Sequence, residues 1–342
     1  MELSWNLKST YLVNLGISIC PENLNLMNLN PNIVILAGGV GAERDVSILS
    51  GQALSDSLSN SFPTRLIEIH ARELPSAIDP QRDVIFPVIH GEFGEDGELQ
   101  NLLEAGGFEY CGSDVLSSRL CMDKAKAKEV VFSEGVRTPQ GIQFEDPSSM
   151  DADEILNTFG NELIIKPIDQ GSSVSLYLIS GKGDLLSTLK QIQSGNWLLE
   201  ERIFGREVTI GVLDRDTLGI VEVIPVGGVY DYKRKYTPGS TEYRFPAILD
   251  SETESEIKEF ALKSYHRCGC RDFARVDFMI CEDGNAHFLE INTLPGLTTT
   301  SLLPKSASSS GYSFDQLTKK LVSPAIHRFN NSSHNGQTPH AA

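Results

Sequence analysis

The sequence has few basic residues for its length. Lys and Arg number 29 against 46 Asp and Glu, which gives a formal net charge of −17 at pH 7. Sequence-independent binding to nucleic acid needs a basic surface, so this charge balance argues against a nucleic-acid partner. An acidic protein that binds a polyanion must gather lysines or metal ions locally, and any such cluster is therefore informative.

Long apolar runs and cysteine-rich patterns are missing as well. No stretch reaches the roughly 18 apolar residues of a membrane span, and the first residues lack the positive segment and long apolar core of a secretory signal. Of six cysteines, only Cys268 and Cys270 lie close together, and C-x-C alone is not a zinc ligand set. We therefore expect reduced thiols in a cytoplasmic protein with no membrane partner.

Two widespread nucleotide-binding motifs are also absent. The loop GGVGAER at residues 38–44 departs from G-x-G-x-x-G because position 44 is Arg, which disfavours an NAD-dependent dehydrogenase. The P-loop pattern G-x-x-x-x-G-K-[ST] does not occur in the chain. A nucleotide, if bound, must be held by a different loop.

Apolar runs and helical patterns alternate along the chain, which is typical of an α/β protein. A strand at 32–37, a helix that begins near Asp45 or Ser47, and a strand at 84–89 predict an α/β first domain. Further helices are expected at 99–105, 122–134, 254–266 and 314–328.

We place three domains between two terminal segments. The domains are an N-terminal α/β domain at 31–116, a central domain at 117–200 and a C-terminal domain at 201–328. Residues 1–30, in which Met27 is a candidate start, form an extension of unknown role. The polar residues 329–342 predict a disordered tail.

The most informative segment is ARVDFMICEDGNAHFLEIN, residues 274–292. Asp283-Gly284 predicts a two-residue hairpin turn, which places Asp277 opposite Glu290 and Arg275 opposite Asn292. Because strand side chains alternate, these four share one face. The other face is then expected to carry the remaining, mostly apolar residues against a core: Val276, Phe278, Ile280, His287, Leu289 and Ile291.

The two opposed carboxylates of this hairpin repel each other and need an opposing charge. Asp277, Glu290 and Asn292 all offer oxygen atoms, which suit a hard cation such as Mg²⁺. A solvated edge, at which Arg275 neutralises one acid, fits the same pattern. The hairpin alone favours neither interpretation.

Several residues are candidates for contacting phosphate. Gly171, Ser172 and Ser173 lie between two strand-like runs, where backbone N–H groups can turn towards an anion, although a plain β-turn fits them as well. Lys166 stands in the apolar run ELIIKP, so it either lies at a sheet edge or meets an anion. For Lys124, on a helix, and Lys235, in a loop, the alternative is an exposed charge.

Five segments in order resemble the D-alanine–D-alanine ligase family. They are GGVGAERDVSILSG (38–51), PVIHGEFGEDGELQ (87–100), IIKPIDQGSSVS (164–175), YDYKRKY (230–236) and RVDFMI…FLEINTLPGLTTTSLLP (275–304). The resemblance spans about residues 32–328. It implies the ATP-grasp fold, with three α/β domains, a Rossmann-like N-terminal domain, and ATP held between the central and C-terminal sheets.

The resemblance also implies a role for each matching residue. At ATP, Lys124 and Lys166 would contact the phosphates, Lys235 would contact the γ-phosphate, and the loop residues Gly171, Ser172 and Ser173 would cover the phosphates. Glu200 and Ile203 would lie at the adenine, and Glu207 at the ribose. Asp277, Glu290 and Asn292 would bind two Mg²⁺, or Mn²⁺, ions. At the amino acids, Glu43 would bind the ammonium of the first D-alanine, with Ser172 and Tyr236 hydrogen-bonded to Glu43 and His90 nearby. Arg275 and the Gly296 backbone would stabilise the oxyanion of the reaction. Ser301 and Leu302 would bind the carboxylate of the second D-alanine.

The implied activity is ATP-dependent joining of two D-alanines through an acyl phosphate, for peptidoglycan precursor synthesis. The implied partners are small molecules and a second copy of the chain in a homodimer. Departures from the family pattern occur at Ser175, Ala274 and Glu201. The alternatives are a ligase that takes D-lactate or D-serine second, which Tyr236 disfavours, and an inactive ATP-binding regulatory protein.

Overall fold

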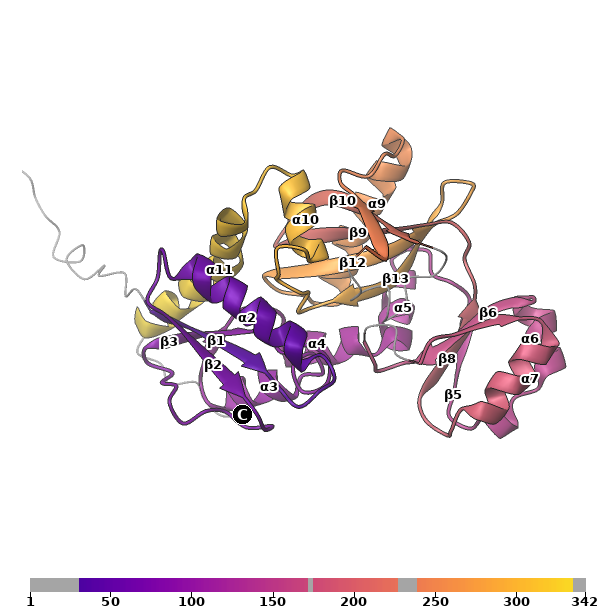
Figure 1. Cartoon of the computed structure of the whole chain (residues 1–342), viewed down its shortest axis with the longest axis horizontal. Helices are drawn as coiled ribbons and strands as arrows, with labels where there is room; N and C mark the ends of the chain where they lie inside the picture. Colours follow the sequence, from indigo (N-terminus) through magenta and orange to yellow (C-terminus); the bar gives the residue numbers. More distant parts are fainter. Residues whose placement is uncertain (1–30, 172–174, 227–238, 335–342) are drawn as a thin grey trace, which may run out of the picture. The chain divides into compact units, whose positions relative to one another are not determined.

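The computed structural model describes residues 31–171, 175–226 and 239–334 (Figure 1). Ser172, Ser173, Lys235 and Tyr236 lie outside the described residues, as do the extension at 1–30 and residues 335–342. Within the described part, no helix has both the length and the apolar character to cross a membrane.

The first sheet is parallel, with strand order β2-β1-β3-β4. Its elements are β1 (Asn32–Gly38), α2 (Arg44–Leu58), β2 (Thr64–Ile69), β3 (Asp83–Pro87), α3 (Glu98–Ala105) and β4 (Glu109–Tyr110). β1 is central and covered on both faces, which explains its unbroken apolar sequence. This sheet confirms the α/β organisation expected for the first domain.

Each face of the first sheet has its own core. Leu99 and Leu103 of α3 pack against one face. On the other face, α2 packs together with α11 (Phe314–His334), whose Leu317, Leu321 and Phe329 join the same cluster (Figure 1). A helix from the far end of the sequence therefore completes the core of the first sheet.

The second sheet is antiparallel, with order β5-β8-β6-β7. Its elements are β5 (Gly141–Phe144), η2 (Pro147–Ser149), α6 (Ala152–Phe159), β6 (Glu162–Pro167), β7 (Tyr177–Ser180), α7 (Lys182–Gln191) and β8 (Trp197–Glu201). Ile155 of α6 and Leu185 of α7 bury against Leu163 and Ile165 of β6. Lys166 alternates with these residues along β6, so it lies on the opposite face.

The third sheet is antiparallel, with order β11-β10-β9-β12-β13. Its elements are β9 (Arg206–Leu213), β10 (Asp216–Pro225), β11 (Thr241–Arg244), α9 (Ser251–Arg267), β12 (Phe273–Ile280), β13 (Ala286–Asn292) and α10 (Leu302–Ser309). α9 packs on one face through Ile257 and Phe260. α10 lies on the other, where its Leu303 would meet a Cβ placed on Gly211 at 2.6 Å.

Two short helices differ from the predicted domain boundaries. α4 (Val115–Met122) and α5 (Lys124–Phe132) were placed mainly in the central domain, but their Cys121 and Val131 pack in the core of the third sheet. Asp114 and Asp123 cap them by accepting hydrogen bonds from backbone N–H groups. The apolar face of a short helix does not reveal which sheet covers it.

The C-terminal helix is longer than the sequence indicated. α11 runs to His334, so it includes residues 329–334, which we had assigned to a disordered tail. Phe329 is buried against the first sheet, and the Arg328 guanidinium binds Asp272 at 2.6 Å. These tertiary contacts stabilise a segment whose Asn and Ser residues have low helix propensity.

Candidate functional site

The β12–β13 hairpin has the predicted register at its polar end. Arg275 pairs with Asn292, and Asp277 pairs with Glu290. The predicted two-residue turn is wrong, however, because Ile280 pairs with Ala286 and Gly284 N donates to Cys281 O across a longer loop. A bulge between Asp277 and Phe278 compensates for the longer turn and restores the pairing.

Because of the bulge, the residues of β13 near the turn that face the core are not the ones we predicted. Phe288 and Ala286 are fully buried with Phe278, whereas His287 and Leu289, expected in the core, are only half-buried. Leu289 instead lines a cavity beside Glu290. One extra residue thus exchanged the two faces of β13 near the turn while leaving the carboxylate pair in place.

An inner cavity of about 130 Å³ lies between the second and third sheets. It brings together eight residues that the resemblance implied for nucleotide, metal or oxyanion binding: Lys124, Lys166, Glu200, Ile203, Glu207, Arg275, Asp277 and Glu290. They come from α5, β6, β8, β9, β12, β13 and the connection after β8. Segments that are far apart in the sequence therefore meet at one concave site.

A buried cluster of opposite charges lies at this cavity. Lys166 Nζ donates to Glu200 Oε1 at 2.5 Å, and Lys128 Nζ donates to Glu200 Oε2. Burial lowers the pKa of Lys128 to about 8. Burial works to raise the pKa of Glu200, but the two ammonium groups hold it below its usual range. Glu200 thus stays ionised inside the protein.

Sequence reasoning missed Lys128. The signal was its spacing, since Lys124 and Lys128 are four residues apart and so share one face of α5. We had treated the lysines of this helix as solvated by default, yet both are buried. Lys124 Nζ donates to Gln170 O at 2.7 Å and lies 3.7 Å from Glu290 Oε2.

The carboxylates of the hairpin are compensated by cations. Arg275 donates from Nε and Nη2 to the two oxygens of Asp277, at 2.9 and 2.7 Å, and Thr209 donates its hydroxyl to the same side chain. Glu290 has Lys124 nearby. The repulsion expected between the opposed acids is therefore offset in this structure by Arg275 and Lys124.

The same residues also fit a hard cation. Asn292 Oδ1 is buried and has no hydrogen-bond partner among the described residues, so an oxygen ligand remains available beside the two acids. The described residues hold no cluster of three or more His, Cys, Asp or Glu side chains suited to a metal. A cation here would rest on two carboxylates, one amide oxygen and ligand oxygens, as Mg²⁺ does in phosphate-binding sites.

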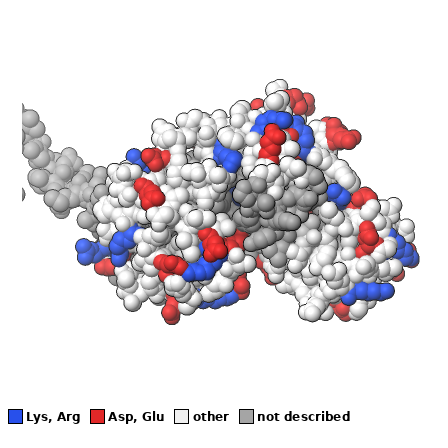
Figure 2. Space-filling view, viewed as in Figure 1, with Lys and Arg blue, Asp and Glu red and all other residues white. Residues whose placement is uncertain are grey.

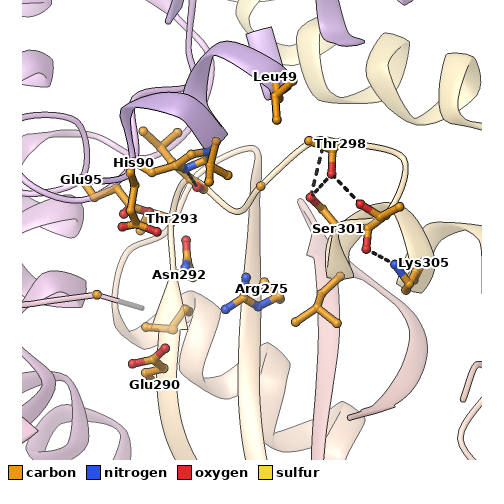
Figure 3. A pocket seen from close by; sticks show the side chains of 18 of the residues that line it. Leu49, His90, Glu95, Arg275, Glu290, Asn292, Thr293, Thr298, Ser301 and Lys305 are labelled. Atoms are coloured by element: carbon orange, nitrogen blue, oxygen red, sulfur yellow. Dashed lines mark hydrogen bonds between the residues drawn. The ribbon is translucent and has the colours of Figure 1, made fainter. Parts of the chain in front are cut away.

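A larger cavity of about 780 Å³ adjoins the inner one and shares Lys124, Arg275, Glu290 and Leu302 with it (Figure 3). It collects four described residues that were expected at the amino acids, Glu43, His90, Gly296 and Ser301, and also Gly171, which was expected at the ATP phosphates. Arg275 therefore stands where the two cavities meet.

The wall formed by the first sheet follows from its topology. Glu43 follows β1 and His90 follows β3, and these two strands are parallel neighbours. After β1 the chain crosses to β2 at one edge of the sheet, and after β3 it crosses to β4 at the other edge. Open α/β sheets form a crevice at the carboxyl ends of two such strands. His90 Nδ1 lies 3.0 Å from Leu294 O, and Ser50 Oγ lies 3.3 Å from its Nε2. These contacts join the first sheet to the segment after β13.

The opposite wall is the start of α10. Ser301 is its N-cap residue, and its Oγ accepts from Thr298 N at 3.1 Å. A Cβ placed on Gly296 would lie 2.9 Å from that Oγ, so a larger residue there would have to displace the Ser301 hydroxyl. Lys305, which we did not predict, donates to Thr300 O, and burial lowers its pKa. This wall thus offers backbone N–H groups and one cation to an anion.

On the face shown in Figure 2, acidic and basic side chains are interspersed over the described surface. No broad basic patch is visible on the described surface of this face (Figure 2). Lys124 and Lys166, which line the inner cavity, and Lys128, which binds Glu200, are buried or nearly so.

Two family models match this chain. One is described as D-ala D-ala ligase C-terminus and matches residues 135–323, and the other is described as D-ala D-ala ligase N-terminus and matches residues 68–113. A D-alanine–D-alanine ligase from Syntrophotalea carbinolica is 38% identical over 86% of this chain and 95% of its own length. The one from Aquifex aeolicus is 36% identical, over 86% and 99%.

Solved structures agree with these matches. The D-alanine–D-alanine ligase of Bacillus anthracis complexed with ATP has a TM-score of 0.76 at 31% identity, over 88% of this chain and 99% of its own. The VanG D-Ala:D-Ser ligase of Enterococcus faecalis has a TM-score of 0.76 at 30% identity, over 86% and 99%. The chain belongs to the D-alanine–D-alanine ligase family and has the ATP-grasp fold.

Proposed function

We propose that this protein is an ADP-forming ligase that joins two D-alanines for peptidoglycan precursor synthesis. The observation that carries the proposal is the pair of adjoining cavities with Arg275 at their junction. One cavity is lined by lysines and acids that suit a nucleotide, and the other has room for two small amino acids. The relatives named as D-alanine–D-alanine ligases support the same activity.

In this proposal, ATP occupies the inner cavity. Lys124 and Lys166 bind its phosphates, and Glu200, Ile203 and Glu207 line the part for adenine and ribose. The family resemblance assigns Lys235, Ser172 and Ser173, which lie outside the described residues, to the same phosphates. Asp277, Glu290 and Asn292 would hold Mg²⁺, or Mn²⁺, which neutralises phosphate charge during phosphoryl transfer.

The amino acids occupy the larger cavity. Glu43 binds the ammonium of the first D-alanine, close to His90. The carboxylate of this D-alanine attacks the γ-phosphate of ATP, which gives an acyl phosphate and ADP. The amine of the second D-alanine then attacks the acyl carbon, and phosphate leaves. Ser301 and the N–H of Leu302 hold the second carboxylate at the start of α10.

Arg275 has the central role in the second step. Negative charge builds on the former carbonyl oxygen, and the guanidinium together with the Gly296 N–H would stabilise it. A well-placed donor of this kind contributes about 3–4 kcal/mol in other oxyanion sites. Arg275 makes two hydrogen bonds to Asp277, so its position is fixed before substrate arrives.

A second candidate is a ligase that takes D-serine or D-lactate as its second substrate. The VanG D-Ala:D-Ser ligase matches this chain with the same TM-score as the D-alanine–D-alanine ligase of Bacillus anthracis. Tyr236, which argued for D-alanine, lies outside the described residues. An inactive regulatory protein is disfavoured because Arg275, Asp277 and Glu290 are all retained at the cavities.

The test is ADP release with D-alanine alone, with L-alanine alone, and with D-alanine together with D-serine or D-lactate, each with ATP and Mg²⁺, and product identification by mass spectrometry. We expect D-alanine to stimulate ADP release and D-alanyl-D-alanine to accumulate. A mixed product with D-serine or D-lactate, formed in preference to the dipeptide, would favour the second candidate. ATP binding without any amino-acid-dependent ADP release would overturn the proposal. The homodimer and the cytoplasmic location stay predictions.

A further inference from the structure

Two lysines share one buried carboxylate at the inner cavity. Glu200 on β8 is 1% exposed, and Lys128 on α5 is 6% exposed. Lys166 and Glu200 line the cavity, whereas Lys128 binds Glu200 but is not one of the residues that line the cavity. The carboxylate therefore has one cation at the cavity and another that does not face it.

The two lysines bind different oxygen atoms of Glu200. Lys166 binds Oε1 of Glu200 at 2.5 Å, and Lys128 binds Oε2. Each oxygen thus has its own ammonium group, and the two ammonium groups together exceed the single charge of Glu200, although Glu290 also attracts both lysines. If Lys166 turned towards a ligand in the cavity, Glu200 would keep Lys128 as its partner.

This arrangement matters because a buried carboxylate resists losing its last partner. Removing one partner of a buried ion pair leaves an uncompensated charge, which is strongly unfavourable. With Lys128 present, that penalty does not oppose the movement of Lys166. Without Lys128, the cluster is a one-to-one pair, and Lys166 is held on Glu200.

We propose that Lys128 is a positioning residue for nucleotide binding: it keeps Glu200 neutralised so that Lys166 is available to the polyphosphate. The proposal rests on the proposed function in so far as the polyphosphate is ATP. Lys128 itself does not touch the nucleotide. A purely structural role, in which Lys128 only fastens α5 to β8, is the competing account.

The first test is nucleotide binding to the Lys128→Met variant, measured by calorimetry with a non-hydrolysable ATP analogue and, in parallel, with adenosine. We expect the Kd for the analogue to rise about ten- to a hundred-fold, the effect of losing one charge-assisted hydrogen bond. The Kd for adenosine, which carries no phosphate, should change by less than about threefold. The matched control is Lys126→Met, since Lys126 lies on the same helix but is exposed and paired with Asp123.

The second test separates positioning from structure. If Lys128 acts by neutralising Glu200, removing the charge of Glu200 should remove the need for Lys128. The double variant Lys128→Met/Glu200→Gln is therefore expected to bind the analogue within about threefold of Glu200→Gln alone. The conservative Lys128→Arg variant keeps the charge and should bind close to the wild type, which also covers the case in which Lys128→Met does not fold.

Two outcomes would overturn the proposal. One is unchanged binding of the analogue by Lys128→Met, and the other is an equal loss of affinity in the wild-type and Glu200→Gln backgrounds. These binding measurements contain no amino acid, so they are distinct from the ADP-release test. A wild-type protein that binds the analogue but never releases ADP with D-alanine would refute the proposed function and leave the Lys128 result to be judged by itself.

Discussion

Replacing Arg275 by Met tests the charge balance at the junction of the cavities. The side chain is 5% exposed and binds Asp277, which is 8% exposed, through two hydrogen bonds. Methionine keeps the apolar stem but leaves the Asp277 carboxylate with the Thr209 hydroxyl and no guanidinium. Breaking a buried pair from one side destabilises proteins by about 3–5 kcal/mol.

The retained Thr209 bond favours the lower end of this range, about 3 kcal/mol. A larger protein loses roughly 2–4 °C of Tm per kcal/mol, so the expected fall is about 6–12 °C by scanning calorimetry. If Asp277 binds a cation, Mg²⁺ with ADP should recover more of the Tm in Arg275→Met than it adds to the wild type. Turnover should fall about 10²- to 10³-fold through kcat.

The matched control is Arg275→Met/Asp277→Asn, in which no uncompensated carboxylate remains. We expect this double variant to regain stability and to lose the additional response to Mg²⁺. An equal Mg²⁺ response in Arg275→Met and the wild type would refute the assignment of Asp277 as a cation ligand. An unchanged Tm in Arg275→Met would refute the claim that the Arg275–Asp277 ion pair stabilises the fold.

Three further variants and conditions test the site. Glu290→Ala should abolish D-alanine-dependent ADP release in a coupled assay, because one of the two carboxylates among the three candidate cation ligands is lost. Glu282→Ala on the exposed turn should leave ADP release intact, and normal turnover in Glu290→Ala would contradict the metal assignment. Ser301→Ala should raise KM for the second D-alanine about tenfold with little change in kcat, and an effect on kcat alone would argue against carboxylate binding. Burial lowers the pKa of Lys128 to about 8, whereas the pKa of a lysine in the unfolded chain is about 10.4, so between these pH values the unfolded chain binds more protons than the folded protein. The free energy of unfolding of the wild type, measured with urea, should therefore rise relative to that of Lys128→Met as the pH increases from about 8 to about 10.4. A relative fall would contradict the direction of the pKa shift.

The hairpin shows how far sequence reasoning reaches. Alternation along the strands and an Asp-Gly pair were enough to place Asp277 opposite Glu290. The turn type and the bulge were not predictable, because a bulge depends on how β13 packs against its neighbours rather than on local propensity. The two errors offset each other at the polar end, so the register was correct although the turn was not.

Charge partners were harder to predict than charge positions. Lys166 and Glu200 were both singled out, but their mutual contact and the role of Lys128 required the tertiary structure. A lysine-rich helix is most often solvated, and the sequence gives no sign that α5 lies beneath β8. Lys305 escaped notice for the same reason, since only folding brings it to the cavity wall.

The position of α11 has a consequence for biosynthesis. A ribosome releases β1 and α2 early, but their apolar faces are covered only when Leu317, Leu321 and Phe329 have been made. The nascent first domain must therefore wait with part of this core uncovered, a state that chaperones recognise and that favours aggregation. Translation that stalls before residue 314 should leave a chain that does not complete this domain.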